Sequence, residues 1–115
     1  MLWYIIWKNT QFNYIQLMEG MIYMYLGELF ITKGIADLIE TKGITPNELM
    51  RCVMRHQRGD YGLLDSHDVA VNERNLNHNS GTVMSEYVIS GHRVWIITTL
   101  HSTQQYSTIL KPSEY

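Results

Sequence analysis

The sequence predicts an α+β domain in which about three helices pack on an antiparallel meander of three to four strands. Between about residues 32 and 78, apolar residues recur at helical spacing, and from about residue 82 onward they alternate with polar ones. Capping and turn residues divide the first part into helices and the second part into strands. Helices that precede a run of consecutive strands are typical of α+β folds.

The length and charge of the chain narrow the classes of function. A chain of 115 residues with a net charge of −2 is expected to form one domain with its own core. Nucleic acid is a possible partner, but the mildly negative net charge does not favour it. The single cysteine, Cys52, excludes an internal disulfide and fits a reducing compartment, so we expect a cytoplasmic protein.

Residues 1–24 are interpreted separately from a single α+β domain over residues 25–115. They are rich in aromatic residues and Met, and they lack the basic region and clean apolar run of a signal peptide. Polar residues interrupt them too often for a membrane span, so we expect no membrane association. They form either two strands, Leu2–Trp7 and Gln11–Leu17, or an extension upstream of a true start as late as Met24.

The first half of the domain begins with a predicted strand over Tyr25–Ile31. Thr32 is a natural N-cap for the helix that follows, and Gly43 is a natural residue for its C-terminal turn. The tetrapeptide Thr45–Glu48 then opens a second helix, with a capping threonine, a proline at the first position and a glutamate at the third.

The second helix is predicted to end at about Arg58, because Gly59 follows. Its inward-facing stripe consists of Leu49, Val53 and His56, with Cys52 beside them. A third helix, capped by Asp65 or Ser66, runs to about His78, where Asn and Gly supply turn chemistry.

Two alternating segments, Thr82–Ser90 and Arg93–Leu100, form the predicted hairpin. They flank Gly91-His92, a two-residue connection with glycine first, as a type II′ turn requires. This register pairs the last residue of the first segment with the first residue of the second. Tyr106–Lys111 is predicted as a final strand.

Four segments of the chain resemble a family of small proteins from bacterial plasmids, phages and integrated elements. They are "LGELFITKGIADLIE", "RHQRGDYGLLDSHDVAVNERNL", "EYVISGHRVWIITTL" and "YSTILKPSEY". The family pattern places a histidine before Gly-Asp-Trp-Gly and later a Trp-Ile-Ile-Thr strand. This chain departs from it at Tyr61, where the family has Trp, and in "HSTQQYST", where the family usually has an acidic residue and an arginine.

The resemblance covers about Tyr25 to Tyr115 and implies a mobile-element origin and a fold, but no reaction. Relatives are often labelled type I restriction subunit M or plasmid-related protein. The first label does not fit, because the chain has neither a glycine-rich cofactor loop nor an Asn/Asp-Pro-Pro-aromatic motif.

The segment Arg55–Gly62 is the first candidate site. In a structural interpretation, His56 is buried and hydrogen-bonded to a backbone carbonyl or to Asp60, while Tyr61 packs against the third helix. In a functional interpretation, His56 is a general base. Asp60 and Tyr61 are also candidate binding residues, together with Trp95 on the sheet.

A second candidate set extends from His56 to the sheet. Small ribonucleases of the barnase and RelE-toxin kind, by analogy only, use His, Arg, Tyr and hydroxyl groups on a concave sheet. The corresponding candidates here are His56, Tyr87, Arg93 and Thr108. No metal or cofactor is expected, because nucleotide-binding and metal-ligating motifs are lacking, and His67 and His78 would lie more than about 15 Å apart on one helix.

These observations favour a non-enzymatic accessory protein of a mobile genetic element. It would bind a host-encoded or element-encoded protein, such as a host defence or regulatory factor. The alternative is a small toxin-like ribonuclease that uses His56 and the hydroxyl groups of the sheet.

Overall fold

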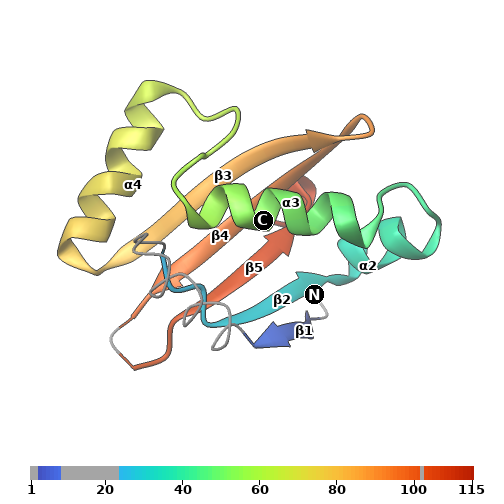
Figure 1. The fold of residues 1–115 in the computed structure, drawn as a ribbon, viewed down its shortest axis with the longest axis horizontal. Helices are drawn as coiled ribbons and strands as arrows, with labels where there is room; N and C mark the ends of the chain where they lie inside the picture. Colours follow the sequence, from blue (N-terminus) through green and yellow to red (C-terminus); the bar gives the residue numbers. More distant parts are fainter. Residues whose placement is uncertain (1–2, 9–23, 102) are drawn as a thin grey trace.

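The computed structural model describes residues 3–8, 24–101 and 103–115, which form an α+β domain as predicted. Figure 1 shows α3 lying across one face of a sheet, with α4 beside β3 and α2 at the far end of the sheet. The elements in chain order are β1 (Trp3–Lys8), β2 (Glu28–Thr32), α2 (Lys33–Glu40), α3 (Pro46–Gln57), α4 (Ser66–His78), β3 (Gly81–Ile89), β4 (His92–Leu100), β5 (Tyr106–Leu110) and the 3-10 turn η1 (Pro112–Glu114).

The strands form one mixed sheet in the order β1-β2-β5-β4-β3. The pair β2–β5 is parallel and the other three pairs are antiparallel. The prediction of a purely antiparallel meander is therefore wrong at β2–β5. Parallel neighbours need a long crossover connection, and the three helices with the β3–β4 hairpin supply it.

Strand β1 falls within residues 1–24, where one interpretation predicted a strand over Leu2–Trp7. The second predicted strand, Gln11–Leu17, lies outside the described residues. That residues 1–24 precede the true start of the protein stays a prediction.

Helix α2 begins as predicted but ends differently. The Thr32 hydroxyl accepts a hydrogen bond from the Ile35 amide (3.4 Å) and so caps the helix. At the other end Lys42, rather than Gly43, adopts the left-handed conformation, with φ of 63°. The amide of Gly43 instead donates to the Leu38 carbonyl (2.8 Å), as in a Schellman motif. Glycine therefore stands one position beyond the left-handed residue.

The caps of α3 and α4 confirm the predictions. The Thr45 hydroxyl accepts from the Glu48 amide (3.2 Å), and Pro46 occupies the first helical position. For α4, Asp65 rather than Ser66 is the cap, since its carboxylate accepts from the Asp68 amide (2.9 Å).

The turn between β3 and β4 does not lie at the predicted position. The turn residues are Ser90 and Gly91, with φ of 50° and 81°, and Ile89 pairs with His92. Two successive residues with positive φ define a type I′ geometry, in which glycine suits the second position. The register differs from the predicted one by two residues, so every side chain keeps its predicted face, because side chains alternate with period two.

The core lies between the sheet and the helices. Its main cluster joins strand residues such as Leu29, Val94 and Ile109 to Leu49 and Val53 of α3. A smaller cluster joins the buried Tyr61 and the strand residues Val83 and Leu100 to the partly buried Leu64, Val69 and Leu76. Tyr61 therefore packs against α4, as predicted.

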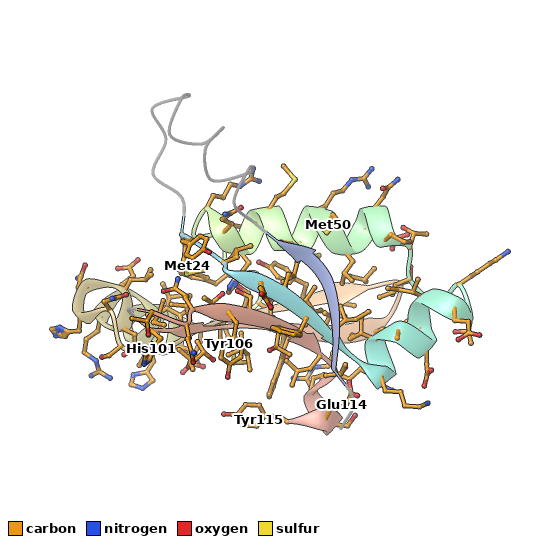
Figure 2. The ribbon with its side chains drawn as sticks, turned by 90° about the horizontal axis from the view of Figure 1, so that it is seen from below. Met24, Met50, His101, Tyr106, Glu114 and Tyr115 are labelled. Carbon is orange, nitrogen blue, oxygen red and sulfur yellow. The ribbon has the colours of Figure 1, made fainter. Side chains whose placement is uncertain are left out.

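Of the residues that the structure describes, those at the end of the chain lie on the opposite face of the sheet. Figure 2 shows α3 on one side of the sheet, and Glu114 with Tyr115 on the other. Within the described residues, none of the helices has the length and apolar character needed to cross a membrane.

Candidate functional site

His56 lies in the core, where α3 presses against the sheet. Its ring is fully buried, with Nδ1 2.5 Å from the Ser85 hydroxyl of β3 and Nε2 2.9 Å from the Thr98 hydroxyl of β4. The burial agrees with the structural interpretation, but the predicted partners, a backbone carbonyl or Asp60, are wrong. The distant strands supply both partners, so no local pattern near His56 could have identified them.

The hydrogen bonds around His56 run in one direction. The Ser107 hydroxyl donates its only proton to the Leu26 carbonyl (2.7 Å), so it must accept from the Thr98 hydroxyl, which is also 2.7 Å away. The Thr98 oxygen then accepts from Nε2–H of His56. Consequently Nδ1 carries no proton and accepts from Ser85. This chain of hydrogen bonds therefore fixes the tautomer of the neutral His56 imidazole.

The chemistry of this histidine is that of a core residue. Burial lowers the pKa of the His56 imidazole to about 3. A base with that pKa, closed off from solvent, is poorly matched to proton transfer near neutral pH. Both ring nitrogens are engaged in these hydrogen bonds, so the ring does not activate the nearby thiol of Cys52. Burial raises the pKa of that thiol.

Asp60 belongs to a separate corner at the end of α3. Its carboxylate accepts hydrogen bonds from Arg55 Nε (2.8 Å) and Nη2 (3.2 Å). These bonds to Arg55 lower the pKa of the Asp60 carboxyl. The Arg55 guanidinium also lies 4.8 Å from the centre of the Tyr87 ring, and the Tyr87 hydroxyl donates to the Asp60 carbonyl (2.6 Å). Burial raises the pKa of the Tyr87 phenol, which therefore stays protonated.

The structure does not bring the four ribonuclease candidates together. His56 and Tyr87 face the helices, whereas Arg93 and Thr108 lie on the opposite face of the sheet. The Arg93 guanidinium is paired with Glu86 (2.5 Å), which also accepts from the indole of Trp95 (2.7 Å).

The face of the sheet opposite the helices contains a groove of about 710 Å³, which we call the open-face groove. Its apolar lining consists of Phe30, Ile97, Tyr106, Leu110 and Tyr115. Its polar lining consists of Thr82, Thr99, Thr108 and Glu114. Among the described residues, no Lys or Arg lines this groove. It is therefore an apolar, aromatic surface with hydroxyl groups and no positive charge.

Two aromatic pairs include residues that line the open-face groove. Tyr106 meets Phe30 edge to face at 6.1 Å between ring centres, and Tyr115 meets Trp95 in the same way at 5.6 Å. Tyr106 and Tyr115 are 41% and 83% exposed, so their rings are available to a ligand (Figure 2). Rings of this kind supply a large contact area at a low cost in conformational entropy.

Glu114 fastens the chain end beside the groove. Its carboxylate accepts from the Thr32 hydroxyl (2.6 Å) and from the amides of Gly34 and Lys111 (2.9 Å each). Burial opposes the charge on Glu114, but these hydrogen bonds outweigh it and keep the pKa of the carboxyl below its ordinary value. Glu114 therefore positions η1 and with it Tyr115.

No family model matches the chain. Searches of curated proteins and of solved structures found no match either. The resemblance to small plasmid-borne and phage-borne proteins accordingly stays a prediction, and the geometry alone supports the choice of site.

Of the binding residues expected from the sequence, only Trp95 lies on the groove side of the sheet. Asp60 and Tyr61 are engaged at the corner between α3 and β3.

The sequence reasoning missed the aromatic residues Phe30, Tyr106 and Tyr115. Alternation along β5 is a signal that could have placed Tyr106 on the same face as Thr108, but nothing local reveals that β2 lies next to β5. Among the described residues, no group of three His, Cys, Asp or Glu side chains could hold a metal ion.

Proposed function

We propose that this protein is a non-enzymatic binding protein whose open-face groove takes up an apolar segment of a protein partner. The observation that supports this proposal is the lining of the groove. None of the described helices covers its aromatic and aliphatic side chains, and hydroxyl groups border them. Exposed apolar surfaces rimmed by polar groups are typical of protein interaction sites.

The charge of the groove favours a protein over RNA. Nucleic-acid sites carry Lys and Arg, which neutralise phosphates. The described lining of the groove contains the carboxylate of Glu114 and no cation. The ribonuclease alternative also needs His56 and Tyr87 on the same side as Thr108, and they face the other way.

The biological setting of this proposal comes from the resemblance. We place the protein in the cytoplasm of a bacterium that carries a mobile genetic element. The partner would be a host-encoded or element-encoded protein, for example a host defence or regulatory factor.

A capture experiment with three immobilised proteins tests the proposal. Tyr106→Ala removes an exposed ring of the groove, and Met54→Asp places a charge on the solvent side of α3, where Met54 is 44% exposed. From host lysate, the wild type and Met54→Asp should retain the same protein, and Tyr106→Ala should lose it. Equal capture by all three proteins would contradict the assignment to the groove.

A parallel incubation with total RNA tests the alternative. We expect no cleavage by the wild-type protein. Cleavage that Thr108→Val or Arg93→Ala abolishes would replace the binding function by a ribonuclease function.

A further inference from the structure

The two edges of the sheet are protected in different ways. Along the β3 edge, the side-chain amide of Asn72 donates to the Met84 carbonyl (2.8 Å) and accepts from the Met84 amide (3.0 Å). Asn75 donates in the same way to the Thr82 carbonyl (2.8 Å). Side chains of α4 thus occupy backbone groups that an added strand would need.

The loop before α4 closes the next part of the same edge. The Leu63 amide donates to the Glu86 carbonyl (2.8 Å), and the Glu86 amide donates to the Tyr61 carbonyl (3.2 Å). Gly62 permits this approach, because a Cβ atom there would lie 2.1 Å from the Glu86 carbonyl oxygen. From Thr82 to Glu86, the β3 edge therefore cannot accept another strand.

At the opposite end of the sheet, the edge strand is β1, which pairs with β2. β1 runs antiparallel to it, with Lys8 opposite Glu28 and Trp3 opposite Thr32, and the pairing is irregular between Ile5 and Trp7. The outer edge of β2 is thus a working acceptor for an extended segment. The outer edge of β2 differs from the β3 edge because a strand, and not a side chain or loop, pairs with its backbone groups.

The connection between β1 and β2 runs from residue 9 to residue 27. Fully extended, a connection of that length reaches roughly 60 Å, whereas the longest dimension of the molecule is 37 Å. By contrast, β3 and β4 are joined through Ser90-Gly91 alone. The covalent link therefore holds β1 near its own β2 but allows it to reach the β2 edge of a neighbouring molecule.

We propose that the β2 edge is an exchangeable strand-acceptor site, and that its occupant in trans is the β1 segment of a second copy of this chain. The same backbone pairing forms within one molecule or between two, so the link alone favours the intramolecular form. As a general reference, covalent tethering of two binding segments gives effective concentrations on the order of 1 mM. Reciprocal exchange gives a closed two-fold dimer whose share rises with protein concentration.

Cysteine trapping at the Lys8–Glu28 pair tests the exchange in the full chain. One tagged copy carries Lys8→Cys and a second, with another tag, carries Glu28→Cys, both with Cys52→Ala. After mixing and mild oxidation, we expect a disulfide-linked dimer with both tags, whose yield rises about tenfold between roughly 10 and 100 µM. The control replaces Glu28→Cys by Glu40→Cys, an exposed position on α2. A yield no higher than that of the control would overturn the proposal.

Light scattering of the unsubstituted chain gives an independent outcome if the variants fail to fold. The wild type should form a growing share of dimer as its concentration approaches about 1 mM. A chain with both Lys8→Cys and Glu28→Cys, oxidised as a monomer, should stay monomeric because β1 is locked in place. A wild type that is monomeric throughout, or a locked chain that dimerises equally well, would refute strand exchange.

Discussion

The helix-covered face and the open face of the sheet carry the same kinds of hydroxyl side chain in different settings. On the covered face, Ser85, Thr98 and Ser107 are buried and linked through His56 into one directed chain of hydrogen bonds. On the open face, Thr82 and Thr99 line a groove that none of the helices in the described part of the chain covers. The residue type is shared, so the covering layer determines whether a hydroxyl stabilises the fold or is available to a partner.

The largest loss of stability is expected from His56→Ala on the covered face. The change leaves a cavity and removes a partner from each of two buried hydroxyls, so it should lower the free energy of unfolding by about 3–4 kcal/mol. Urea denaturation measures it. A loss of unfolding free energy below about 1 kcal/mol would show that the buried chain of hydrogen bonds contributes little to stability.

A matched pair of substitutions compares neighbouring threonines on opposite faces. Thr98→Val deprives His56 and Ser107 of a partner in the core and should destabilise the protein by about 2–3 kcal/mol. Thr99→Val makes the same chemical change on the open face and should stay within about 0.5 kcal/mol of the wild type. Equal effects in denaturation experiments would remove the distinction between the two faces.

The buried imidazole of the covered face should make the stability of the protein depend on pH. Burial lowers the pKa of His56 from 6.5 to about 3 in the folded protein. Below pH 6.5 the unfolded chain takes up a proton that the folded chain does not, so the stability present above that pH is lost as the pH falls toward 3. Between pH 7 and 5 this residue should account for about 2 kcal/mol of lost stability. His56→Gln, which cannot titrate, should show a flatter profile, and identical profiles would contradict the shift.

The smallest effect concerns the open face. Glu114→Gln weakens the hydrogen bonds that hold η1 to the start of α2, and we expect about 1 kcal/mol of destabilisation. The Tyr115 ring should lose its fixed contact with Trp95, which nuclear Overhauser effects between the two rings would report. Unchanged ring contacts would show that Glu114 does not position Tyr115.

Local signals in the sequence are sufficient to predict structural features that a few neighbouring residues determine. The caps at Thr32, Thr45 and Asp65 depend on hydrogen bonds that span three residues, and all three are present. The hairpin turn was misplaced, because Ser90-Gly91 and Gly91-His92 are both acceptable two-residue connections and only the pairing of the whole strands chooses between them.

The features that depend on distant parts of the chain could not be read from the sequence. The parallel neighbour of β2 lies more than seventy residues away in β5, and the open-face groove exists only because these strands meet. The partners of His56 come from two different strands for the same reason. The sequence indicated that His56 is buried, through its place on an apolar stripe, but not which groups would satisfy it.

The central position of β5 has a consequence for the order of folding. It lies between β2 and β4, yet the chain supplies it after every other strand. Hairpin β3–β4 can form early from near neighbours, whereas β2 joins the sheet only through the late strand. Closure over such sequence distances slows folding relative to that of locally connected domains. The rate-limiting step should therefore be the insertion of β5, and weakening β5 should slow folding more than weakening the β3–β4 turn.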